Sequence, residues 1–245
     1  MNVPGTNVAI LSRPSKMKIR INDKLTQIYS FGLRAGVSCP GATYDVNHKC
    51  SGCYARKGRY SYPTARKAQD IRTEWTMDAM ETRDKRKAWI DILKKEVHWA
   101  TVRRNVEYFR LHHGGDFFSA AYIDSWHEII EDFPTVKFWG PTSSHLKQAH
   151  PKALRLLNEM QPALLDLATK PNAIIRPSPR LKGVGNILEV DGLAAGTGVI
   201  TRKELKELET LFGINICPAK QNGNVCGDCT ACWDEPLIGK YYPDH

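Results

Sequence analysis

Residues 106–119 read VEYFRLHHGGDFFS and set the pattern for the chain. The apolar residues of the run 106–111 predict a short strand, and Gly114 and Gly115 predict a tight turn after it. Ser119 is a suitable N-cap residue, and apolar residues between 122 and 133 then recur at helical spacing until Pro134 stops the helix. The stretch therefore predicts a strand, a loop and a helix in succession.

The same alternation is expected on both sides of this unit. Further strands or short apolar runs are predicted at residues 25–31, 136–139, 163–168, 173–176 and 187–190. Helices are predicted after Pro63, with helical spacing in residues 71–79 and 89–97, and again at 146–160 and 201–212. Such alternation indicates an α/β fold with a parallel sheet, open or curled into a barrel, whose ligands lie at the carboxyl ends of the strands.

The composition is that of a globular protein with a basic surface. Hydrophobic residues make up 42% and charged residues 25% of the 245 residues, which argues against a disordered chain. No apolar run suits a signal peptide or a membrane span, so we expect a cytoplasmic protein with no membrane partner. The net charge of +9, concentrated in residues 56–72 and 83–95, favours an anionic partner such as nucleic acid. Solvated helix faces would explain the same charge.

Four of the seven cysteines lie in the C-terminal tail. Cys217, Cys226, Cys229 and Cys232 are separated by eight, two and two residues. Three cysteines at two-residue gaps with a fourth at a distance are typical of the ligands of a [4Fe-4S] cluster. Zinc is the competing interpretation, although its four-cysteine sites more often use two pairs with a longer spacer.

The other three cysteines, Cys39, Cys50 and Cys53, follow the first predicted strand. They are separated by ten and two residues, and they could hold three corners of a [4Fe-4S] cluster whose fourth iron stays open. A structural zinc site completed by His48 is the alternative. An odd number of cysteines in a reducing cytosol indicates metal binding rather than disulfides.

The first cysteine loop, its aromatic neighbour Tyr54 and the Gly-Gly-Asp segment 114–116 resemble the radical SAM superfamily. That family has shorter gaps between its cysteines and a Glu at the acidic position. The resemblance implies a partial (β/α) barrel at residues 1–212, an auxiliary cluster in a tail at 213–245, and S-adenosylmethionine as a cofactor. It places Asp116 at the amino group of that cofactor.

Other candidate binding residues at the strand ends are Gly114, Gly115, Ser143, Ser144, Arg176 and Ser178. For Ser143 and Ser144, capping of the helix predicted from residue 146 is the competing role.

A second resemblance, to bacteriophage proteins of the gene product 88 type, extends over almost the whole chain. The segments that carry it are Cys39 to Gly41, CSGCYARKGRY at 50–60, GDFFS at 115–119, RPSP at 176–179 and the cysteine tail. This resemblance implies a viral origin and hence the cytoplasm of the host cell.

Three functions fit the sequence. The first is a radical SAM-type enzyme of unknown substrate, with an electron donor protein as partner. The second is a non-enzymatic iron-sulfur protein for redox transfer or regulation. The third is a zinc-stabilised protein that binds nucleic acid. The pair His112 and His113 is expected to be structural, with one ring pointing inward and the other facing away.

Overall fold

A central sheet of four parallel strands organises the protein. The computed structural model describes residues 1–13, 18–21, 24–40, 42, 53–147, 149–178, 189–194, 196–200, 217, 226, 228–235 and 240–243. The strands of the central sheet lie in the order β3 (Tyr29–Phe31), β4 (Tyr108–His112), β5 (Lys137–Thr142) and β6 (Ala173–Pro177). All neighbouring pairs are parallel, so the four carboxyl ends lie at one edge of the sheet.

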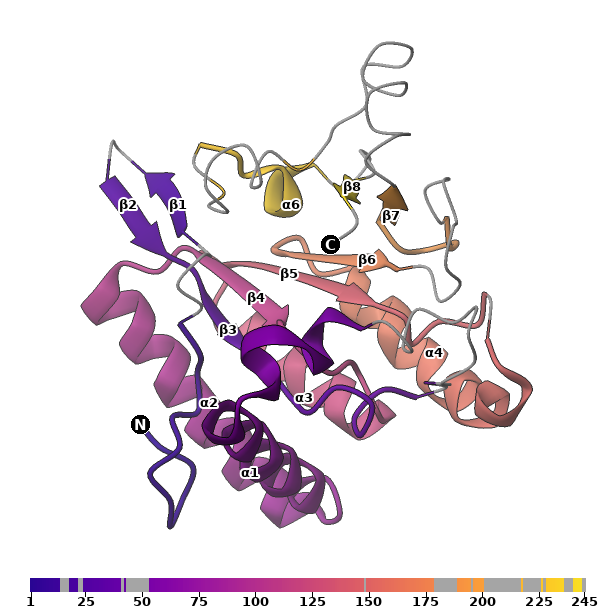
Figure 1. Ribbon diagram of the computed structural model, residues 1–245, viewed down its shortest axis with the longest axis horizontal. Coiled ribbons are helices and arrows are strands. Elements are labelled where there is room, and N and C mark those ends of the chain that lie inside the picture. Colours follow the sequence, from indigo (N-terminus) through magenta and orange to yellow (C-terminus); the bar gives the residue numbers. More distant parts are fainter. Residues whose placement is uncertain are drawn as a thin grey trace.

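Four helices cover one face of this sheet, shown below the strands in Figure 1. They are α1 (Pro63–Ala79), α2 (Arg83–Arg104), α3 (Ala120–Glu131) and α4 (Leu154–Ala168). Between helices and sheet lies the main core, in which Trp89 and Trp126 contact each other edge to face at 5.9 Å and both contact Phe31. Burial of such large aromatic side chains is a main source of the stability of this layer.

The opposite face of the sheet carries smaller elements and a second core. These elements include the antiparallel pair β1 (Lys18–Ile21) and β2 (Lys24–Gln27), the parallel pair β7 (Thr197–Ile200) and β8 (Lys240–Pro243), and the short helix α6 (Ala231–Asp234). Trp139 and Ile174 point from the sheet into this second core, where they meet Trp233 of α6. The sheet is therefore covered on both faces, as parallel sheets generally are.

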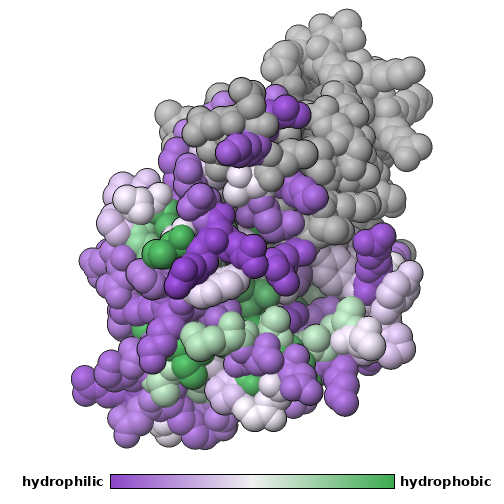
Figure 2. All heavy atoms as spheres, turned by 90° about the vertical axis from the view of Figure 1, so that its left-hand side faces the viewer, coloured by the Kyte–Doolittle hydropathy of each residue, from purple (hydrophilic) through white to green (hydrophobic). Residues whose placement is uncertain are grey.

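Single-turn helices complete the described structure. η2 (Tyr54–Arg56) and η3 (Gly58–Ser61) precede α1, and η4 (Pro151–Ala153) precedes α4. The side of the molecule shown in Figure 2 is mostly hydrophilic, with small apolar patches between the polar side chains. Among the described residues, no helix has the length and apolar character that a membrane crossing requires.

Several predicted elements correspond to the structure, and others need correction. The Ser119 hydroxyl caps α3 as expected, since it accepts a hydrogen bond from the backbone N–H of Tyr122 at 3.2 Å. The helix predicted at 146–160 begins later than expected: the single turn η4 starts at Pro151 and α4 follows it from Leu154. His150 has an extended conformation, as residues before a proline usually do. Residues 163–168 continue α4, and residues 25–31 form two strands, of which only β3 joins the central sheet.

Other predictions stay untested. The helix predicted at 201–212 lies outside the described residues, as do residues 187 and 188; residues 189 and 190 form no strand. The described strands β3 to β6 form no closed barrel, and the sheet order is compatible with an open or a partly curled sheet. The partial barrel of radical SAM type and the division at residue 212 therefore remain predictions.

Candidate functional site

The loops that follow β3 and β4 are bonded to each other at the carboxyl edge of the sheet. The backbone N–H of Leu33 donates to the Gly114 carbonyl at 2.9 Å, and that of Asp116 donates to the Ser38 carbonyl at 3.1 Å. Gly115 has a φ of +77°, and a Cβ atom there would lie 2.8 Å from the Leu33 Cβ and closer still to the Ser38 hydroxyl. Glycine is needed at this position for both its conformation and its size.

Asp116 connects the end of β4 to the end of β5. Its buried carboxylate accepts hydrogen bonds from the Thr142 hydroxyl at 2.7 Å and from the backbone N–H of Ser143 at 2.7 Å. It also accepts one from the backbone N–H of Phe117 at 2.8 Å. Three donors favour the ionised form of the carboxylate and fix its position. Both carboxylate oxygens are thus engaged by the chain itself.

The predicted residues Ser143, Ser144 and Ser178 meet Asp116 at this edge. The Ser143 hydroxyl donates to the Ser178 carbonyl at 3.3 Å, and the Ser144 hydroxyl donates to the Phe117 carbonyl at 2.6 Å. The expected helix-capping role of the two serines is wrong, because no helix starts at residue 146.

Sequence reasoning missed two residues of this edge. Thr142 binds Asp116, and the buried ring of His145 is hydrogen-bonded through Nε2 to the Ser178 carbonyl at 3.0 Å. The available signal was their position directly after the predicted strand at 136–139, where polar side chains of a parallel sheet gather.

The segments that carry Cys39 and Cys53 are both attached to the end of β4. Cys39 follows Ser38, the acceptor for the backbone of Asp116, and its sulfur accepts a weak hydrogen bond from the Gly36 N–H at 3.4 Å. Cys53 precedes η2, and the hydroxyl of the next residue, Tyr54, donates to the His113 carbonyl at 3.1 Å. Both cysteines are half-buried thiols, and Cys50 lies outside the described residues.

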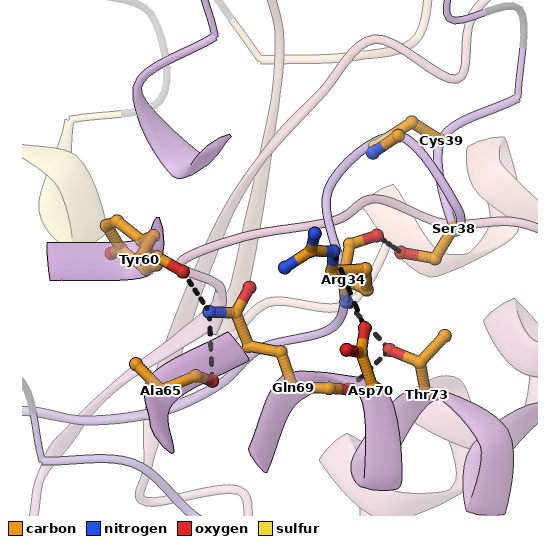
Figure 3. A network of polar contacts seen from close by, with 9 residues as sticks. Arg34, Ser38, Cys39, Tyr60, Ala65, Gln69, Asp70 and Thr73 are labelled. Carbon is orange, nitrogen blue, oxygen red and sulfur yellow. Dashed lines mark hydrogen bonds and ion pairs between the residues drawn. The ribbon is translucent and has the colours of Figure 1, made fainter. Parts of the chain in front are cut away.

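Helix α1 supports the loop before Cys39 through a network of polar contacts (Figure 3). The backbone N–H of Arg34 donates to the Thr73 hydroxyl at 2.7 Å, and that hydroxyl donates to the Gln69 carbonyl at 2.8 Å. The Arg34 guanidinium lies 3.5 Å from the Asp70 carboxylate, and the Ser38 hydroxyl donates to the Arg34 carbonyl at 3.0 Å. The loop is therefore held in place from α1 as well as from β4.

His112 and His113 are both buried, so the expectation that one ring faces away is wrong. His112 is hydrogen-bonded to the Tyr122 hydroxyl at 3.0 Å, and His113 to the Ser30 hydroxyl at 2.9 Å. Burial, together with the charges of nearby arginines, lowers the pKa of each histidine to about 3. Both rings are therefore neutral near pH 7 and hold the sheet edge together.

The cysteines of the tail lie near one another on the opposite face of the sheet. The backbone N–H of Cys226 donates to the Lys18 carbonyl at 3.0 Å, and Cys226 and Cys232 pack against the second core. Burial, together with the charges of Cys232, Cys217 and Cys229, raises the pKa of the Cys226 thiol to about 12. Within the described part of the chain, however, no three histidine, cysteine or acidic side chains adopt the arrangement of a metal site.

Arg176 attaches the tail to the sheet. It was predicted as a candidate cofactor-binding residue, but its side chain is fully buried and donates to the carbonyls of Ala231 at 3.2 Å and Glu235 at 2.6 Å. The indole N–H of Trp233 donates to the Phe109 carbonyl at 3.1 Å, which fixes α6 from a second strand. Arg176 lies at the end of a strand, as predicted, but its side chain binds carbonyls of the tail.

Arg110 lies between the two cysteine-bearing regions and was not predicted. Its guanidinium donates to the Tyr54 hydroxyl at 3.1 Å, beside Cys53, and to the His112 carbonyl at 2.9 Å. The same guanidinium lies over the ring of Trp139, 4.7 Å from its centroid, and Trp139 belongs to the core on which the tail cysteines pack. One cation thus contacts residues adjoining both regions.

Comparisons with known proteins point to bacteriophages. The family model described as "Gene product 88" matches residues 9–178. The "Gene 88 protein" of Mycobacterium phage L5 is 31% identical over 130 residues, which cover 53% of this chain and 52% of that protein. The "Gene 88 protein" of Mycobacterium phage D29 is 40% identical over 50 residues, 20% of this chain and 21% of that protein. The chain therefore spans about half the length or less of these relatives, and no solved structure matches it.

Gly115→Ala should destabilise the protein more than Gly58→Ala. Both glycines have positive φ, which costs an alanine about 1 kcal/mol, but a Cβ at Gly58 meets nothing within 4 Å. At Gly115 the contact with the loop after β3 adds about 1–3 kcal/mol. Urea denaturation of both variants measures the difference, and equal losses of stability would show that the two loops are not packed together.

Arg176→Met should release the tail while the main core stays folded. Two backbone carbonyls of the tail lose a charged donor, and each such hydrogen bond contributes about 1.5–3 kcal/mol. Hydrogen exchange of residues 228–235 should accelerate about 10-fold or more, with β4 and β5 unchanged. Arg155→Met, which removes an exposed arginine paired with Glu159, is the control. Equal exchange in the two variants contradicts the assignment.

Proposed function

Because the chain belongs to the gene product 88 family of phage proteins, we propose a function that this family name does not describe: an iron-sulfur protein with two [4Fe-4S] clusters. In the proposal, a first site leaves one iron open and a second site is fully ligated. The ligands of the first are Cys39, Cys50 and Cys53, and those of the second are Cys217, Cys226, Cys229 and Cys232.

The observation that carries the proposal is the gathering of the tail thiols against the sheet. The backbone N–H of Cys229 donates to the Cys226 carbonyl at 3.2 Å, and Cys226 and Cys232 pack against the same second core. If the four thiols were deprotonated together, the thiolates would repel one another, and a bound cation would remove that cost because it would neutralise them. An all-sulfur donor set suits zinc or an iron-sulfur cluster, and the two successive two-residue gaps favour the cluster.

The first site has the surroundings that a reactive cluster would need. Its loop is held by Asp116 and by α1, and the segment after Cys53 is held by the His113 carbonyl. We propose that the sheet is part of a radical SAM-type barrel. S-Adenosylmethionine would supply radical chemistry at the open iron, while Gly114, Gly115 and the polar groups of Ser143 and Ser178 position it. Arg176 is assigned to the tail instead.

A non-enzymatic redox or regulatory protein is the second candidate. The observation that favours it is that the chain itself engages both carboxylate oxygens of Asp116 through Thr142, Ser143 and Phe117. A ligand ammonium group would then have to share these oxygens. In either case an electron donor protein of the host cytoplasm is the proposed partner.

Substitution of one cysteine in each site should remove one cluster at a time. Protein purified without oxygen should contain about eight irons and about eight sulfides per chain. Cys50→Ser and Cys229→Ser should each retain about half of the iron, because the two proposed sets of ligands share no cysteine. Loss of all iron from either folded variant, or stoichiometric zinc in the wild type, contradicts the assignment.

Reduction in the presence of S-adenosylmethionine separates the two candidates. An enzyme of radical SAM type should release 5'-deoxyadenosine, detected by liquid chromatography, and Cys50→Ser should abolish the release while Cys229→Ser retains the first cluster. Iron-loaded protein that releases none supports the redox or regulatory function.

A further inference from the structure

The segment after Cys53 presents a strip of cations at the surface. Residues 54–69 read YARKGRYSYPTARKAQ and contain five basic residues and no acidic residue. All five side chains are exposed, and they lie on η2, η3 and the start of α1. We call them the basic strip: Arg56, Lys57, Arg59, Arg66 and Lys67.

Most of the basic strip is not neutralised by carboxylates. Elsewhere on the surface, Lys85, Lys87 and Lys94 each form ion pairs with acidic residues. In contrast, Lys57, Arg59, Arg66 and Lys67 form no ion pair with any residue that the structure describes. The last two also lie near the N-terminus of α1, where the helix dipole disfavours cations and no acidic residue occupies the first turn. Such an arrangement costs stability and suits an external anion.

Exposed aromatic rings lie within the same segment. Tyr62 is 60% exposed and Tyr54 is 45% exposed, although large aromatic side chains usually bury most of their surface. Tyr54 has a structural role through its hydroxyl, whereas the side chain of Tyr62 makes no cap contact at the start of α1. Flat rings between cations are typical of surfaces on which unpaired bases stack while the backbone phosphates are neutralised.

We propose that the basic strip, with Tyr62, binds single-stranded nucleic acid. Acidic peptide would use the cations alone, and a duplex would leave no unstacked base for the ring. Tyr54 and Tyr60 both donate to the His113 carbonyl, which holds this segment at the end of β4. Because Cys53 directly precedes Tyr54, a strand bound to the basic strip would pass beside the proposed first cysteine site. This inference goes beyond the iron-sulfur function, and binding does not depend on iron.

The test measures binding of a fluorescein-labelled 15-nucleotide deoxythymidine strand to the full chain by fluorescence anisotropy, across a range of NaCl concentrations. The strip variant carries Lys57→Gln, Arg59→Gln, Arg66→Gln and Lys67→Gln. The control carries four exposed changes on α2: Arg83→Gln, Lys87→Gln, Lys95→Gln and Arg103→Gln. Both lower the formal net charge from +9 to +5, so they differ in where the charge is lost; the control also opens the exposed Lys87–Asp91 ion pair.

The strip variant should bind at least 10-fold more weakly than the wild type. Its salt dependence should also fall, by up to about 3 in the slope of log affinity against log salt, because each phosphate contact on a single strand contributes about 0.7. The control should stay within about 3-fold of the wild type at the same salt concentration, since a local contact rather than net charge determines affinity. Circular dichroism checks that both variants are folded.

Tyr62→Ala tests the stacking part separately and should weaken binding about 5-fold or more without changing the salt slope. Poly-glutamate of equal charge should compete poorly. The proposal is overturned if the wild type does not bind, if strip and control variants weaken equally, or if poly-glutamate competes as well as the strand and Tyr62→Ala has no effect. Iron content, measured on the same samples, reports the iron-sulfur proposal independently.

Discussion

The hydrogen bonds of Asp116 are the constraint on which the arrangement of the sheet edge depends. The backbone of this residue reaches the loop after β3 through Ser38, and its carboxylate reaches the end of β5 through Thr142 and Ser143. Parallel pairing alone would bring the strand ends to one edge, but it would not fix the loops that follow them. Asp116 fixes the loop after β3, its own loop after β4 and the end of β5. The loop after β3 carries Cys39 directly after Ser38.

On the opposite face of the sheet, side-chain donors hold the tail. Arg176 is buried and holds the tail by two carbonyls, and Trp233 fills the second core while donating to β4. Arg110 reaches from that core to Tyr54. A buried guanidinium is stable only when its donors find acceptors, and the carbonyls of Ala231 and Glu235 supply them. The described residues beside Cys53 and those of α6 are thus both held to the central sheet.

Local patterns were sufficient to predict much of the central layer. The run 106–119 predicted β4, its glycine turn and the Ser119 cap of α3, because these depend on residues close in sequence. The late start of α4 was missed, although Pro151 gave a local signal against a helix from residue 146. The burial of Arg176 and of His113 could not be predicted, since their partners Ala231 and Ser30 lie far away in the sequence. For the same reason cysteine spacing predicted a tail site but not the face of the sheet against which Cys226 and Cys232 pack.

The proposed function requires that cysteine sulfurs from two segments distant in the sequence bind iron. Mössbauer spectroscopy of protein produced with ⁵⁷Fe and purified without oxygen tests this most directly. We expect the quadrupole doublets of [4Fe-4S]²⁺ clusters to account for nearly all of the iron. A spectrum of mononuclear or nonspecific iron, or folded protein that excludes iron and retains zinc, would contradict it.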